Sequence, residues 1–256
     1  MPSVLVERDR DVLLVTINRP EARNAVDQAT ALDLFQAFDA FDRDGALNVA
    51  ILTGIGGTFC AGADLREVAA GSRGPISEKG PAPMGPTWMQ LSKPVLAAVE
   101  GHAVAGGLEL ALWCDLRVAA QDAVFGVFCR RWGVPLIDLG TVRLPRLIGQ
   151  SHALDLILTG RGVSGEEALR MGLVNRMVES GKALQSALEL AHTIANFPQR
   201  CLRADRLSAF NQWSLSSDQA RLIELRGGLE VLNSGESREG ASRFAAGAGR
   251  HGASTT

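Results

Sequence analysis

The stretch that decides the fold reads Gly101-His102-Ala103-Val104-Ala105-Gly106-Gly107-Leu108-Glu109-Leu110. Small residues occupy the point where a strand gives way to a helix, so a ligand can approach the main chain closely. A similar turn lies upstream, at Thr58-Phe59-Cys60-Ala61-Gly62-Ala63-Asp64-Leu65. The first N–H groups of a helix have no intrahelical partner and lie at the positive end of its dipole. Two such turns that face each other would form an oxyanion hole, although tight packing of a strand on a helix requires the same small residues.

Strands and helices alternate on either side of these turns. The apolar runs predict buried strands at residues 12–17, 49–53, 95–99, 116–120 and 124–126. Residues 4–6 are expected to pair with the first strand through a hairpin at 9–11. Asp27 is expected to cap a helix, and Ser164 with Glu167 predicts a capping box.

The strand signals end near Lys182, and the rest of the chain has a helical pattern. Helices are predicted at 184–194, 199–210 and 218–232. Residues 71–87 are rich in Gly, Pro and Ser and predict a mobile loop. The expected organisation is an α/β core over residues 1–195 and a C-terminal helical region over residues 196–256.

Composition excludes several functional classes. The 256 residues carry a net charge of −2, without the basic excess that a nucleic-acid partner demands. A polybasic run and an uncharged span of membrane length are both missing, so no membrane partner is expected. Four cysteines have no CxxC spacing and are expected to be reduced and mostly buried, with no metal site. The first residues lack the apolar core of a signal peptide, so we expect a cytoplasmic protein.

Short stretches in a fixed order carry a resemblance from about residue 10 to about residue 245. They are Ile17–Pro20, Asn24-Ala25, Phe59–Leu65, Lys93-Pro94, Ala97–Gly101, Ala105–Ala111, Cys114-Asp115, Phe125-Gly126, Gly140-Thr141, Leu144–Arg146, Ala168-Leu169 and Gly172–Val174. Together they resemble the enoyl-CoA hydratase/isomerase family, also called the crotonase superfamily. The resemblance implies a crotonase-type spiral of repeated β-β-α units with a C-terminal helical region that drives trimerisation, in homotrimers or homohexamers.

The resemblance also implies an acyl-CoA thioester as the substrate, with coenzyme A as part of it and no metal or redox cofactor. The backbone N–H groups of Ala63 and Gly106 would bind the thioester carbonyl oxygen and stabilise an enolate. Three residues of the first turn region would lie along coenzyme A, namely Ala61, Asp64 and Leu65. Arg23 would lie near the coenzyme A phosphates, although a solvated loop arginine is an equal interpretation.

Glu109 is an acidic residue in an otherwise apolar helix. A buried charge is costly unless it is paired or used, so two interpretations remain. Glu109 is either a structural carboxylate in a salt bridge or a general acid/base whose pKa burial raises toward neutrality. By resemblance it matches the first catalytic glutamate of the hydratases.

The chain departs from the hydratase pattern after Phe125-Gly126. Cys129 stands where the hydratases carry their second catalytic glutamate, and a thiol with an ordinary pKa is a poor replacement for a carboxylic acid. Asp138 lies just before Gly140-Thr141, where family isomerases carry an acidic residue. It would serve as the second carboxylate beside Glu109, or else cap a turn and contact only backbone.

The expected function is therefore hydration or double-bond isomerisation of an enoyl-CoA by a hydratase-like lyase. Two alternatives stay open. A degenerate family member would bind acyl-CoA without catalysis, which the glutamate missing at Cys129 favours. Another enolate reaction, such as thioester hydrolysis or decarboxylation, would use the same oxyanion hole.

Overall fold

The computed structural model describes residues 1–249. The chain divides into one compact unit over Met1–His192 and a second unit from Thr193 to the end of the described residues. The sequence places this boundary after residue 195, and residues 250–256 of the expected helical region lie outside the described part.

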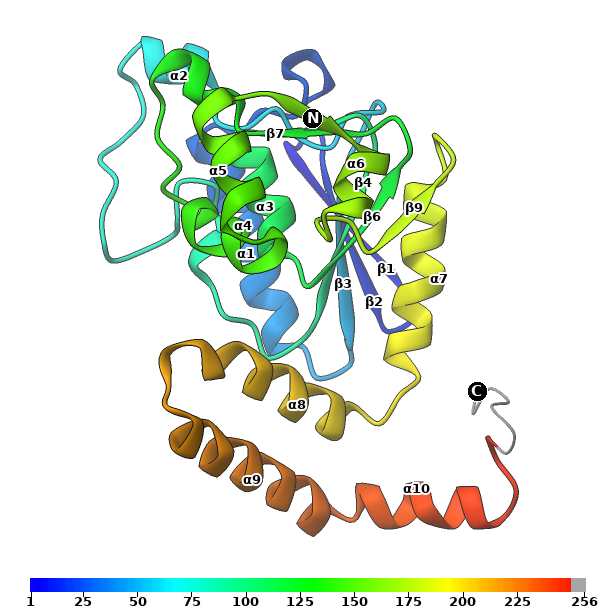
Figure 1. Cartoon of the computed structure of the whole chain (residues 1–256). Coiled ribbons are helices and arrows are strands. Elements are labelled where there is room, and N and C mark those ends of the chain that lie inside the picture. The colour runs from blue at the N-terminus through cyan, green and yellow to red at the C-terminus, as the bar shows by residue number, and fades with distance from the viewer. Residues whose placement is uncertain (250–256) are drawn as a thin grey trace. The chain divides into compact units, whose positions relative to one another are not determined.

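The first unit is built on a six-stranded sheet with the order β1-β2-β3-β4-β6-β9. Its strands are β1 (Val4–Asp9), β2 (Val12–Ile17), β3 (Val49–Gly54), β4 (Val95–Val99), β6 (Leu116–Ala120) and β9 (Arg176–Val178). β1 is antiparallel to β2, and every other neighbouring pair is parallel. The strands β1, β2 and β3 run side by side in Figure 1. Because β3 and β4 are almost continuously apolar and buried, they suit the interior of a parallel sheet.

A smaller sheet has the order β5-β7-β8. Its strands are β5 (His102–Val104), β7 (Val124–Gly126) and β8 (Gly162–Ser164). β5 is parallel to β7, with His102 opposite Val124. Since β5 leads directly into a helix, this sheet fixes where that helix begins.

Helices and short 3₁₀ turns connect and cover these strands. They are η1 (Pro20–Ala22), α1 (Gln28–Arg43), α2 (Leu65–Ala69), η2 (Pro86–Trp88), α3 (Gly106–Trp113), η3 (Phe128–Trp132), α4 (Gly140–Ile148), α5 (Gln150–Thr159), α6 (Gly165–Arg170) and α7 (Ala183–Ala195). The helix α1 begins as predicted, because the Asp27 side chain accepts a hydrogen bond from the Thr30 N–H at 2.8 Å.

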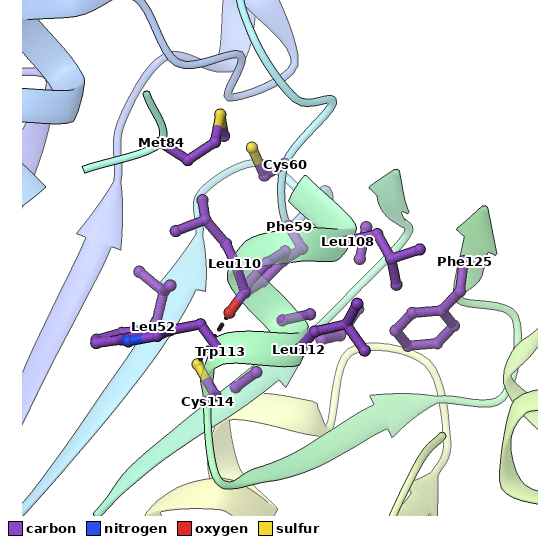
Figure 2. Close-up of a cluster of buried hydrophobic side chains, with 14 of the residues drawn as sticks. Leu52, Phe59, Cys60, Met84, Leu108, Leu110, Leu112, Trp113, Cys114 and Phe125 are labelled. Atoms are coloured by element: carbon purple, nitrogen blue, oxygen red, sulfur yellow. Dashed lines mark hydrogen bonds between the residues drawn. The ribbon is translucent and has the colours of Figure 1, made fainter. Parts of the chain in front are cut away.

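The helix α3 lies at the centre of the core. All eight of its residues are buried, which explains why its sequence shows no polar face. Figure 2 shows its neighbours, with Cys60 and Met84 near its first turn and Trp113 and Cys114 at its end. Phe38 packs edge-on against Trp113 with ring centroids 4.8 Å apart. A charged residue within this helix is therefore held in the interior of the protein.

Two local predictions need correction. Ser164 caps α6 by accepting from the Glu167 N–H, but the Glu167 carboxylate binds Arg161 instead of closing a capping box. The predicted mobile loop divides into an exposed part up to residue 81 and a largely buried part over residues 82–88 that ends in η2. The buried part exists because Met84 and Thr87 have partners in the core.

The second unit is helical, as predicted. It contains α8 (Gln199–Asn211), η4 (Gln212–Ser214), α9 (Ser217–Ser234) and α10 (Glu236–Ala245). The helix α10 was not predicted, whereas α8 and α9 match the helical pattern closely. Across residues 1–249, no helix combines the length and the apolar character needed to cross a membrane.

Candidate active site

The two small-residue turns lie side by side and are bonded through their main chains. The Cys60 N–H donates to the His102 carbonyl at 2.8 Å, and the Val104 N–H donates to the Cys60 carbonyl at 3.1 Å. Cys60 thus pairs with Ala103 as in a parallel sheet. A Cβ on Gly107 would lie 2.1 Å from the Cys60 carbonyl oxygen, so only glycine permits this approach. The spacing of the turns is set by backbone contacts.

The N–H groups of Ala63 and Gly106 are available at this junction. A Cβ built on Gly62 would lie 2.9 Å from the Gly106 nitrogen, which places the first turn directly against the start of α3. Within residues 1–249, no protein acceptor receives a hydrogen bond from the N–H of Ala63 or Gly106. Gly106 is the first residue of α3, where N–H groups have no intrahelical acceptor. The arrangement can therefore bind an anionic oxygen.

A cavity of about 920 Å³ opens at this junction. Seven of the eight predicted site residues line it, namely Arg23, Ala61, Ala63, Leu65, Gly106, Glu109 and Asp138. Arg23, just after η1, and Leu65, the first residue of α2, are exposed. Glu109 and Asp138 are each only 2% exposed. The cavity therefore leads from an exposed basic and apolar rim to two buried carboxyl groups.

Asp64 is the predicted site residue that does not line the cavity. One of its oxygens accepts from the Arg66 N–H at 3.0 Å and caps α2. The other pairs with Arg19 at 3.0 Å, and Arg19 also pairs with Asp27 at 3.0 Å. Both carboxylate oxygens of Asp64 thus help to hold the first turn in place, and its contact with a ligand stays a prediction.

Glu109 projects from α3 into the cavity. Its Oε1 accepts hydrogen bonds from the N–H groups of Asp138 at 2.9 Å and Gly140 at 2.8 Å. In the described part of the chain no ion pair includes Glu109, so the structure offers no salt bridge for a purely structural carboxylate. Burial and then the charge of Asp138 raise the pKa of Glu109 to about 7, although the two backbone hydrogen bonds lower it. Such a group can both accept and donate a proton near neutrality.

Asp138 is held by the buried part of the loop. Its Oδ1 accepts from the Met84 N–H at 2.9 Å and from the Thr87 hydroxyl. Arg143 supports both neighbours, because its guanidinium donates to the carbonyls of Asp138 at 3.0 Å and Thr87 at 2.7 Å. Burial raises the pKa of Asp138, whereas the Thr87 and Met84 hydrogen bonds and the nearby Arg73 and Arg143 lower it. Asp138 thus contacts a side chain as well as backbone.

Each carboxyl group keeps one oxygen toward the cavity. Within residues 1–249, no donor reaches Glu109 Oε2 or Asp138 Oδ2, and neither is among the fully enclosed polar atoms that lack a partner. Since both residues line the cavity, these two oxygens are the groups that a bound molecule meets.

Cys129 lines the same cavity and is 6% exposed. Burial, and after it the charge of Glu109, raises the pKa of its thiol. The side chain is therefore a neutral thiol at pH 7 and has no negative charge to offer a substrate.

The sequence patterns did not single out Met84, Thr87 or Arg143. Met84 is an ordinary apolar residue, and its contribution to Asp138 is a backbone N–H. Thr87 binds Asp138 from 51 residues away, and Arg143, five residues after Asp138, donates to its carbonyl from α4. The signal that pointed to this region was the Gly- and Pro-rich composition, which indicated a loop but not its buried end.

Comparisons with known proteins agree with this geometry. The model of the family described as enoyl-CoA hydratase/isomerase matches residues 7–247. The chain is 38% identical over 251 residues to enoyl-CoA hydratase EchA19 of Mycobacterium tuberculosis, which covers 95% of this chain and 94% of that protein. It is 35% identical to 2,3-dehydroadipyl-CoA hydratase of Escherichia coli, with 95% and 96% covered. The crystal structure of enoyl-CoA hydratase EchA1 from Mycobacterium marinum matches with a TM-score of 0.91 at 39% identity, covering 96% of each chain.

Proposed function

The chain belongs to the enoyl-CoA hydratase/isomerase family, and on that premise we propose that it is an enzyme that hydrates or isomerises an enoyl-CoA thioester. One observation carries the proposal. The open N–H groups of Ala63 and Gly106 and the free oxygens of Glu109 and Asp138 belong to the same cavity. An oxyanion site beside two proton-transfer groups is what enolate chemistry at a thioester requires.

The amides of Ala63 and Gly106 stabilise the charge that develops on the thioester oxygen. Each donor of such a pair contributes roughly 3–4 kcal/mol to transition-state stabilisation. In hydration, water loses one proton to a carboxylate as its oxygen bonds to the β-carbon, the electrons of the double bond move into the enolate, and a proton returned by a carboxyl group completes the α-carbon. In isomerisation, a proton leaves the α- or γ-carbon and returns to the other one.

Glu109 moves the proton in either reaction, because its pKa of about 7 lets it alternate between base and acid. Asp138 serves as the second carboxylate. The Cys129 thiol, whose pKa is raised further, does not replace the glutamate that the hydratases carry at that position. The two carboxyl groups therefore take different proton-transfer roles on one substrate.

Coenzyme A enters as part of the substrate, and the proposal needs no metal or redox cofactor. Arg23, Ala61 and Leu65 lie on the cavity wall where the coenzyme A moiety would leave it. We also propose a homotrimer or homohexamer formed through the helical second unit. That unit exposes large apolar side chains at Leu207, Phe210, Trp213, Leu225, Leu229 and Leu232. Analytical ultracentrifugation would contradict this assembly if it found a monomer.

The direct test is product analysis with the purified protein. Crotonyl-CoA and a trans-3-enoyl-CoA are incubated with the wild type and with Glu109→Gln, and the products are separated by liquid chromatography with mass detection. We expect a hydrated or double-bond-shifted thioester with the wild type only.

Two outcomes would contradict the proposal in different ways. Tight binding of CoA esters without turnover by the wild type across a broad panel would make the protein an acyl-CoA binder. Release of free coenzyme A or of carbon dioxide as the main product would assign thioester hydrolysis or decarboxylation instead.

A further inference from the structure

Large apolar side chains that line the active-site cavity are exposed. Trp132 is 71% exposed, Ile76 is 55% exposed and Ile137 is 40% exposed, and all three line the cavity. Ile137 directly precedes Asp138 in the chain. Apolar surface that borders a cavity and remains in water is stabilised when a ligand covers it.

The short helix η3 links this rim to the catalytic floor. In a 3₁₀ helix, side chains three residues apart lie above one another on the same face. Cys129 and Trp132 have that spacing in η3 (Phe128–Trp132), and both line the cavity. Cys129 is 6% exposed and is close enough to Glu109 for that carboxylate to raise its pKa. One face of η3 therefore leads from the neighbourhood of Glu109 outward to the Trp132 ring.

The helix η3 is held in place by its two arginines, of which Arg131 also lines the cavity. The Arg130 Nε donates to the Ile157 carbonyl at 3.1 Å. Arg131 donates to the Gly160 carbonyl through Nε at 3.1 Å and Nη2 at 2.7 Å, and its guanidinium lies 3.9 Å from the centre of the Phe128 ring. Both acceptors are at the end of α5. These contacts hold the backbone of η3 and therefore fix the place from which the exposed Trp132 side chain projects.

From this arrangement we infer that the substrate is a thioester with a long or bulky apolar acyl group, whose distal part lies along the Cys129–Trp132 face of η3. The inference rests on the proposed function, because it places the reacting carbons between the oxyanion site and Glu109. It also gives Cys129 a role. A neutral thiol leaves the path apolar, whereas a glutamate there would put a carboxylate beside the chain.

The test compares acyl lengths in both turnover and binding. We would measure kcat/KM for trans-2-enoyl-CoA esters with four and ten carbons, and the Kd of the saturated four- and ten-carbon acyl-CoAs by calorimetry. Each fully buried methylene contributes about fourfold to affinity, so partial burial of six predicts a preference for ten carbons of at least about tenfold.

Two variants test the assignment to η3. Trp132→Ala should reduce the ten-carbon to four-carbon ratio by about tenfold in kcat/KM and in Kd. Leu158→Ala is the matched control, because Leu158 is 72% exposed on α5 and does not line the cavity. It should leave the ratio unchanged.

The outcomes separate this inference from the proposed function. Equal or better use of the four-carbon esters by the wild type would overturn the inference and leave the function intact. The inference would also be overturned if Trp132→Ala weakened kcat/KM and affinity equally for the four- and ten-carbon esters. A changed sedimentation of this variant would overturn it too, because Trp132 would then be a subunit contact. If no ester is turned over, the function fails, and the Kd values still decide the acyl preference.

Discussion

Glu109 and Asp138 line one cavity and are equally buried, yet different regions of the molecule hold them. Glu109 stands on the fully buried helix α3 and receives only backbone N–H groups. Asp138 lies on an irregular segment, where the Thr87 hydroxyl, the Met84 N–H and the positive charges of Arg73 and Arg143 favour its ionised form. Burial raises the pKa of both carboxyl groups, and the comparison teaches that Asp138 has a side-chain donor that opposes the rise, whereas Glu109 has only backbone donors.

Glu109→Gln should cause the greatest loss of activity. The amide oxygen can still accept from the Asp138 and Gly140 N–H groups, so the geometry should persist while the proton-transfer group is lost. We expect kcat to fall by about 10²–10⁴-fold, as for other general acid/base groups. Steady-state kinetics with the best enoyl-CoA ester measures this. A loss below about tenfold would assign the proton transfer to another residue.

Glu109 should also make the protein less stable as the pH rises. Its pKa of about 7 in the folded chain exceeds its ordinary value of 4.5, so the folded state retains a proton that the unfolded state releases between those values. The free energy of unfolding should therefore decrease from pH 4.5 to pH 7, by about 3 kcal/mol for this group.

Urea denaturation between pH 5 and pH 8 measures this effect. Glu109→Gln is the matched control, since glutamine does not titrate, and the difference between variant and wild type should grow in favour of the variant toward pH 7. Parallel curves for the two proteins would show that the pKa of Glu109 is not raised.

Asp138→Asn removes one charge and keeps the shape of the side chain. We expect kcat to fall by about 10–100-fold, less than for Glu109→Gln. The charge of Asp138 is one cause of the raised pKa of Glu109, so its removal should lower that pKa. The acidic limb of the kcat/KM profile should therefore move to lower pH. An unmoved limb would mean that the two groups titrate independently.

The smallest expected effect belongs to Thr87, which positions Asp138. Thr87→Val removes a hydroxyl that lowers the pKa of Asp138, so that pKa should rise and kcat/KM should fall by about fivefold. Thr87→Ser keeps the hydroxyl and should restore both the rate and the pH profile. Equal defects in the two variants would point to packing alone as the role of this residue.

The sequence predicted well what depends on local pattern. The strands β2, β3, β4, β6 and β7, the Asp27 cap and the helices α7 to α9 follow from apolar periodicity and capping residues, whereas the strand β5 was not predicted. The family resemblance nominated Ala63 and Gly106, although their side chains carry no chemistry. A single charge in an apolar helix was enough to select Glu109, because burial of an unpaired carboxylate is costly.

What the sequence missed depends on contacts between distant segments. Met84 and Thr87 reach Asp138 across more than fifty positions, with separations of 54 and 51 residues. The sequence also did not indicate that Asp64 binds Arg19, which lies 45 residues earlier in the chain. The residues next to Met84, Thr87 and Asp64 in the sequence do not indicate these contacts, because each partner comes from another part of the fold.

The main-chain ladder between Cys60 and Ala103 has a consequence for how such a protein changes over evolutionary time. The distance between the two anion-binding amides is inherited with the backbone, whereas the acids around them are side chains on other elements. A substitution at position 129 or 138 changes a side chain that lines the cavity and involves no hydrogen bond of the ladder. Single replacements can therefore change the chemistry of the cavity while the spacing of the two turns is kept.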